Sequence, residues 1–313
     1  MPEAPAQELT PPPPGANPAG GDAAAAAQAR VLEGLAAHRR GALAAAEACF
    51  RAALAAAPAH FEALQLLGAL RLQQRDHAGA VAWLERAVAV RATVPRAWFN
   101  LGLARLELGR PREALDALEQ ALRLRPHYAE ALNSRGNALV MLRRPQEALA
   151  SYAAALALRP GHAPTHANIA AAYFELERFA EAAEACRRGL ALEPQSLELH
   201  SKLGLSLYRS GDFDGADREL LAADPGDTAA FALRGHLRQR LCDWSQLSAF
   251  RERLQGPGPA ASAVLDPFVV LALLDDPRLV RDAARRASAH QVRQVPAAVR
   301  ETALAPAVGY RHG

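Results

Sequence analysis

The chain has 313 residues, a formal net charge of +3, and an apolar fraction of 50% with only 5% aromatic residues. So small a charge over this length argues against a nucleic-acid-binding protein that depends on phosphate contacts. The scarcity of aromatic residues favours helices packed through Ala and Leu over a core of bulky rings, and the length would allow one to three ordinary domains.

The sequence also bears on the compartment. The three cysteines lie far apart without a CxxC pair, as is typical of buried small residues in a reducing environment. The N-terminus lacks the basic start and apolar run of a signal peptide, and no segment reaches the roughly 18 apolar residues of a membrane span. We therefore expect a soluble cytoplasmic protein that does not bind a membrane.

Residues 1–22 are rich in Pro, Ala and Gly, with Pro11 to Pro14 in a row. This composition favours an extended, disordered tail. Helical sequence is expected from near Ala23, where a run of alanines begins.

From Ala27 to about residue 227, small residues recur with a period of 34. We number the positions within the repeat as places, with Pro95 at place one of the third repeat. Place twenty is alanine in six successive repeats, at Ala46, Ala80, Ala114, Ala148, Ala182 and Ala216. Place eight is Gly or Ala, at Gly34, Gly68, Gly102, Gly136, Ala170 and Gly204. Place twenty-four is mostly a large residue, at Phe50, Leu84, Leu118, Tyr152, Cys186 and Leu220.

This pattern predicts helical hairpins, because two helices approach to about 8 Å only where Gly or Ala makes the contact. A turn is expected near Gly109 and Arg110, and Pro126 ends the second helix of its repeat. No hairpin could bury such a face alone, so the hairpins must stack. The first helices are expected over residues 62–74, 96–108, 130–142, 164–176 and 198–210.

The third repeat resembles the tetratricopeptide repeat (TPR) through Trp98, Leu101, Gly102, Ala114 and Ala121, together with its closing proline. The resemblance implies an all-α fold, a right-handed α-solenoid of six to seven hairpins over residues 23–255. The seventh hairpin, at about 228–255, would be degenerate and anchored by Phe231, Gly235 and Trp244.

Residues 256–313 break the period. Gly256 to Ser262 form a breaker, and the pairs Asp266-Pro267 and Asp276-Pro277 each place a capping residue before a proline, so two helices are expected. We interpret the segment as a helical connector that ends in an irregular tail.

Cys242, Trp244 and the stretch from Leu265 to His290 are similar to the connector of bacterial O-GlcNAc transferase-like (SPINDLY-like) proteins. In that family the connector leads into a UDP-sugar-dependent glycosyltransferase. Val308 to Tyr310 resemble the first step of that region, but the sequence stops at Gly313 and the catalytic region is absent. No catalytic residue is carried over, His312 included.

Motifs for other chemistry are absent from the sequence. It contains no P-loop, GxGxxG, HExxH, GxSxG or paired CxxC pattern, so we predict no cofactor and no metal site. His162 and His166 have the i, i+4 spacing of a metal pair, but His166 stands at a packing place and the structural interpretation is favoured.

The predicted binding site is the concave face, formed by places five, six and nine of the first helices. The polar residues there are Asn100, Asn133, Asn137, Asn168 and Lys202. An asparagine amide can both donate to and accept from the backbone of an extended peptide, and the resembled transferase arm implies such an asparagine ladder. The ladder is sparse, because Leu66 and Ser134 occupy place six in other repeats, so solvated polar residues remain the alternative.

Two functions follow as hypotheses. The first is an interaction module that binds a protein or an extended peptide in the concave groove and binds no nucleic acid. The alternative is the substrate-recruiting arm of an O-GlcNAc transferase-like enzyme whose catalytic lobes are missing from this chain. The sequence leaves open whether the chain belongs to an enzyme, the identity of the partner or sugar, and the oligomeric state.

Overall fold

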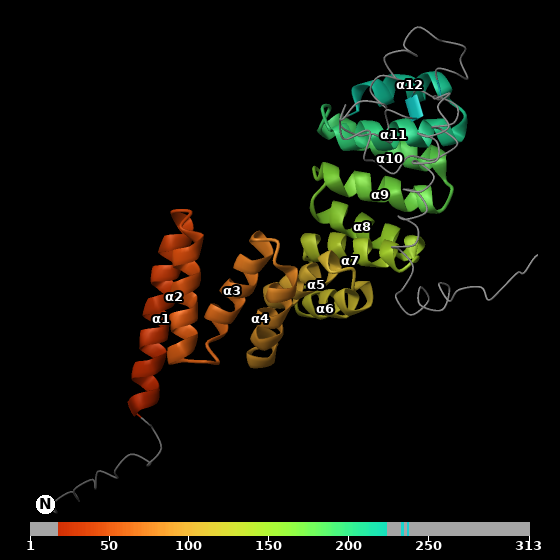
Figure 1. Cartoon of the computed structure of the whole chain (residues 1–313). Helices are drawn as coiled ribbons and strands as arrows, with labels where there is room; N and C mark the ends of the chain where they lie inside the picture. The colour runs from red at the N-terminus through yellow and green to blue at the C-terminus, as the bar shows by residue number, and fades with distance from the viewer. Residues whose placement is uncertain (1–17, 224–232, 235–236, 238–313) are drawn as a thin grey trace, which may run out of the picture. The chain divides into compact units, whose positions relative to one another are not determined.

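A computed structural model describes residues 18–223, 233–234 and 237. The chain divides into two units, residues 1–158 and 159–313, which we describe separately. The described residues form twelve α-helices and no strand (Figure 1). The first unit contains α1 (Pro18–Arg39), α2 (Leu43–Ala56), α3 (Phe61–Gln73), α4 (His77–Val90), α5 (Pro95–Glu107), α6 (Pro111–Leu124), α7 (Ala129–Met141) and α8 (Pro145–Leu158). The second contains α9 (Ala163–Glu175), α10 (Phe179–Leu192), α11 (Leu197–Ser210) and α12 (Phe213–Ala222).

Each hairpin is held by contact between a small residue on one helix and a large one on the other. A Cβ atom added at Gly102 of α5 would lie 2.7 Å from Cγ of Leu118 on α6, and one at Gly204 would lie 2.6 Å from Cγ of Leu220. The alanines at place twenty are all 0% exposed. Places eight, twenty and twenty-four therefore form the hairpin interface, as the spacing predicts.

The helix boundaries agree with the predicted ones. The odd-numbered helices from α3 to α11 each begin one residue before the predicted start. The first helix differs, because α1 begins at Pro18 and not near Ala23. The added residues include Gly20 and Gly21, which are poor helix formers, whereas the proline at the first position is favourable there.

The turn within each hairpin has one recurring backbone conformation. Place fifteen has a positive φ in all six repeats, at Gly41 (77°), Arg75 (60°), Gly109 (68°), Arg143 (60°), Glu177 (57°) and Gly211 (90°). In the third hairpin the next N–H, that of Arg110, donates to the Arg105 carbonyl at 2.9 Å. This is the Schellman arrangement that ends a helix, and it turns the chain into the second helix.

Successive hairpins pack through the second helix of one and the first helix of the next, as α4 packs on α5 and α10 on α11. Arg105 of α5 donates to Glu85 of α4 at 2.9 Å, and Arg71 of α3 forms an ion pair with Glu47 of α2. These pairs join neighbouring repeats.

The first helices also contact one another, since α3 contacts α5 and α5 contacts α7, while in the second unit α9 contacts α11. Within the described parts of each unit the second helices hardly touch one another. The first helices therefore line the inner face of each unit, which is the arrangement of an all-α solenoid.

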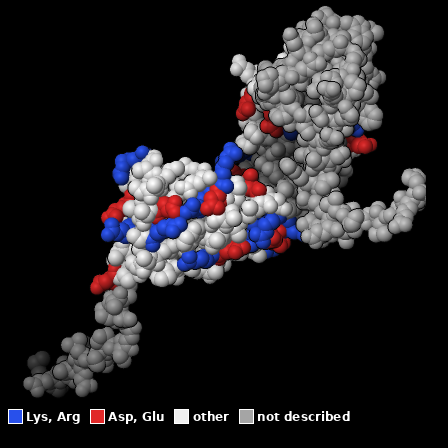
Figure 2. Space-filling model, viewed as in Figure 1, with Lys and Arg blue, Asp and Glu red and all other residues white. Residues whose placement is uncertain are grey.

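Charges of both signs are interspersed over the visible face of the first unit (Figure 2). Among the described helices, we find none with the length and hydropathy needed to cross a bilayer.

The predicted seventh hairpin and the connector at 256–313 fall almost wholly outside the described residues. Of this part only three residues are described: Leu233, Arg234 and Leu237. Arg234 donates to Asp217 of α12 at 3.0 Å, and Leu237 is 0% exposed.

Candidate functional site

The inner face of the first unit carries a pocket of about 240 Å³ formed by α1, α3 and α5. Its lining residues stand at places two, five, six and nine of three consecutive first helices. They are Val31, Leu35, Glu62, Gln65, Leu66, Ala69 and Arg96. Places five, six and nine are those that the sequence indicates for the binding face, although the residues found there are not the predicted ones.

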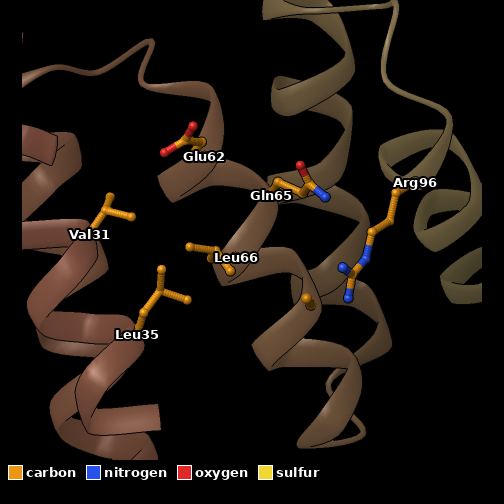
Figure 3. Close-up of a pocket in the computed structure, with 7 residues that line it drawn as sticks. Val31, Leu35, Glu62, Gln65, Leu66 and Arg96 are labelled. Carbon is orange, nitrogen blue, oxygen red and sulfur yellow. The ribbon is translucent and has the colours of Figure 1, made fainter. Parts of the chain in front are cut away.

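The pocket has an apolar end and a polar end (Figure 3). Val31 and Leu35 point from α1 toward α3, and Leu66 points back toward α1. On the other side of α3, Gln65 and Arg96 extend toward each other from α3 and α5. A bound side chain would therefore meet hydrocarbon between α1 and α3, and polar groups between α3 and α5.

Two side-chain contacts join α1 to the start and the end of α3. Gln28 Oε1, in the middle of α1, lies 3.1 Å from Nε2 of His60 at the start of α3, and His38 Nε2 lies 2.9 Å from Gln73 Oε1 near the C-terminal ends of both helices. Between these two contacts Leu66 remains only partly buried.

The charged residues at the rim are exposed and have no partner in the described part of the chain. Neither Glu62 nor Arg96 forms an ion pair there. Three other arginines on the same three helices are paired: Arg30 with Glu33 at 2.8 Å, Arg71 with Glu47, and Arg105 with Glu85. Arg96 is thus available to a ligand.

The predicted asparagines of the first unit lie on α5 and α7, outside the pocket lining. Asn100 is only 8% exposed, so little of its side chain is accessible to a ligand. Asn137 accepts a hydrogen bond at Oδ1 from the hydroxyl of Tyr152 at 2.8 Å, which leaves its NH₂ group for other contacts. Asn133 is partly exposed.

In the second unit, Asn168 lies on α9 and is partly exposed. Lys202 on α11 forms an ion pair with Glu198 at 3.4 Å, one helical turn before it. The structure thus places all five predicted residues on first helices, but in two units described separately.

The other titratable side chains singled out in the sequence belong to the packing. His162 Nδ1 lies 2.7 Å from the Thr165 hydroxyl at the start of α9. Burial, followed by the positive charge of Arg188, lowers the pKa of His166, which favours a neutral ring at its packing place. Burial raises the pKa of the Cys186 thiol to about 12.

Comparison with protein families identifies the repeat. The sequence profile described as "Tetratricopeptide repeat" matches residues 31–97 and 99–163, and a second profile with the same description matches residues 163–196. Together these matches span more than half of the chain. The chain therefore belongs to the tetratricopeptide-repeat family. No curated protein matches it significantly.

Solved structures with the same fold include PilW, described as a widely conserved type IV pilus biogenesis factor, with a TM-score of 0.58 and 21% identity. The match covers 64% of this chain and 97% of that one. Pseudomonas aeruginosa PilF matches with a TM-score of 0.55, 18% identity and coverage of 64% and 95%. YrrB, described as a TPR protein with an unusual peptide-binding site, matches with a TM-score of 0.50, 22% identity and coverage of 54% and 88%. At these identities the likeness concerns the fold alone.

The resemblance to O-GlcNAc transferase-like proteins finds no support in these comparisons. The residues that carry it, from Cys242 to His290, also lie outside the described part of the chain.

Proposed function

We propose that this protein is a protein-interaction module that holds a peptide segment of a partner protein on the inner face of its first unit. The observation that carries the proposal is the pocket between α1, α3 and α5. Tetratricopeptide-repeat units bury their large side chains between stacked helices, and the stacking leaves the first helices to line a binding surface. Here that surface is hollowed where three neighbouring hairpins meet.

The physical case rests on what a peptide would gain in this pocket. Leu35 and Leu66 are partly exposed apolar residues beside the buried Val31, so a side chain that enters between them is removed from water on two sides. Burying one large apolar side chain contributes about 1.5–3 kcal/mol. YrrB, which shares the fold, is described as having a peptide-binding site.

The asparagines supply a second part of the proposal. Asn133 and the NH₂ group of Asn137, both on α7, would bind the backbone of the same peptide beyond the pocket. In the second unit Asn168 and Lys202 would offer comparable polar contacts on its own inner face. Each backbone hydrogen bond would contribute about 0.5–1.5 kcal/mol net.

The test is to select binding peptides from a random library displayed on phage, with the full chain as bait. Their affinity is then measured for the wild type and for Ala69→Phe, which fills the pocket with a ring. The matched control is Ala82→Phe, an exposed alanine of α4 outside the pocket. We expect Ala69→Phe to weaken binding at least tenfold and Ala82→Phe to leave it unchanged.

Circular dichroism must show that both variants retain the helical content of the wild type. Selected peptides that bind wild type and Ala69→Phe equally would place the interaction elsewhere. A library that yields no binder would reject the proposal.

A further inference from the structure

We infer that the pocket selects a peptide segment in which one bulky aliphatic or aromatic residue is accompanied by an acidic residue, with the acid on the α5 side. The inference rests on the proposed function and adds the chemistry of the partner to it. It depends on three features of the pocket: its size, the unpaired charge of Arg96, and the position of Glu62.

The size favours a single anchor side chain. A volume of 240 Å³ is below the roughly 300–1,000 Å³ of sites that enclose a small molecule. The apolar end is formed by Leu35 and Leu66 beside the buried Val31, and Ala69 lines the pocket one helical turn after Gln65. Because Leu35 and Leu66 are only partly buried, and Ala69 adds no more than a methyl group to the pocket lining, one Leu, Met or Phe side chain from a partner can enter there.

The charge favours an acid at the polar end. Arg96 extends from α5 toward Gln65, and it has no ion pair in the described residues although arginines nearby are held by glutamates. A guanidinium with free donors binds a carboxylate through two parallel hydrogen bonds. The amide of Gln65 beside it can donate to the same carboxylate.

Glu62 determines on which side the acid can lie. Its carboxylate stands above Val31 and Leu35 at the apolar end, on the other side of α3 from Arg96 (Figure 3). An acidic residue placed between α1 and α3 would be repelled there, whereas one placed between α3 and α5 would be attracted. Such a pair of opposite charges discriminates between the two placements by both attraction and repulsion.

The geometry of an extended peptide gives the spacing. Alternate side chains of an extended chain point to the same face, about 7 Å apart. An anchor between α1 and α3 with an acid over α5 therefore corresponds to residues two positions apart. We expect the selected peptides to share a pattern of one bulky apolar residue and an Asp or Glu two positions from it.

The experiment uses a fluorescein-labelled selected peptide and three versions of it, with the anchor changed to Ala, the acid to Ala, and the acid to Lys. Fluorescence anisotropy with the full chain measures each affinity. We expect about a 10- to 100-fold loss for the anchor version, up to about fivefold for acid to Ala, and about tenfold for acid to Lys.

Arg96→Glu should reverse the charge preference, so that the Lys version binds better than the original peptide. Arg112→Glu, the same charge change on an exposed residue of α6 outside the pocket, should leave the original preference intact. Raising the salt concentration should weaken the original peptide more than its acid-to-Ala version, since exposed ion pairs are screened.

The outcomes separate this inference from the proposed function. Peptides that bind, are blocked by Ala69→Phe, and show neither the shared acid nor a response to Arg96→Glu would overturn the inference and leave the proposed function standing. If Arg96→Glu and Arg112→Glu changed the affinity of the peptides equally, the change would be only a general charge effect. This result too would overturn the inference.

Discussion

Replacing Arg75 by glycine should stabilise the protein, because this residue occupies the left-handed place of its turn. Arg75 has a φ of 60° and is exposed, and in the described residues it makes no ion pair. In the equivalent turn the place is filled by Gly109 with a φ of 68°. A left-handed conformation costs a residue with a Cβ atom about 1–2 kcal/mol, and glycine is spared this cost.

The net gain in the free energy of unfolding is smaller than the cost of the left-handed conformation at Arg75. Glycine gives the unfolded chain more freedom, which costs about 0.4–1 kcal/mol. We therefore expect Arg75→Gly to raise the free energy of unfolding by about 0.5–1 kcal/mol. Gly109→Ala is the reverse test, and it isolates the backbone cost, because a Cβ atom at Gly109 would have no other atom within 4 Å. It should destabilise by about the same amount.

The measurement is urea unfolding followed by far-UV circular dichroism, with midpoint and slope compared for the two variants and the wild type. Stacked repeats can unfold in steps, so hydrogen exchange at the turn amides should accompany the midpoints. A lower midpoint for Arg75→Gly, or an unchanged one for Gly109→Ala, would refute the account of strain at this place.

Gly102→Ala should lower the free energy of unfolding by about 1–3 kcal/mol in urea unfolding, because the new methyl group meets Leu118; an unchanged value would contradict the close contact of the two helices. Tyr152→Phe should lower the free energy of unfolding by about 1 kcal/mol in the same measurement, since it removes the hydrogen bond to Asn137. A double-mutant cycle with Asn137→Ala should show coupling between the two residues, and additive effects would mean that the bond contributes nothing. Cys186 should resist iodoacetamide at pH 8 in the folded protein and react after unfolding, because its raised pKa keeps the thiol protonated below about pH 12. Mass spectrometry measures the labelling, and equal rates in both states would contradict the burial of Cys186.

Most of the fold could be predicted from the sequence, because the spacing of small and large residues in the repeat follows from the contacts between the helices. Gly102 and Ala114 could be placed at a hairpin interface since only small residues permit that approach. The repeated pattern also predicts the boundaries of α3, α5, α7, α9 and α11 to within a residue. The shared turn conformation was missed. Arg75, Arg143 and Glu177 give no local signal of a positive φ, and the conformation follows from the need to turn at the same point in every hairpin.

The candidate pocket lies on the face formed by the first helices, but none of the five predicted residues lines it. The predicted asparagines of the first unit lie on α5 and α7, but the pocket lies where the same face combines apolar residues with Glu62, Gln65 and Arg96. The signal available in the sequence was Leu35 and Leu66, large apolar residues at places outside the hairpin interface. Whether such residues close a surface or leave a hollow depends on the separation of α1 from α3, which the repeat pattern does not encode.

The position of the pocket makes binding depend on a docking equilibrium. Its apolar end exists only while the hairpin of α1 and α2 stays docked on α3, and α2 packs on α3 over a smaller interface than α4 does on α5. If a fraction of molecules has this hairpin undocked, the apparent dissociation constant rises in inverse proportion to the docked fraction. A bound peptide would in turn shift the population toward the docked state, by about 2.7 kcal/mol at a ligand concentration one hundred times the dissociation constant. Arg71 and Glu47, which join α3 to α2 outside the pocket, would thereby influence affinity without touching the ligand.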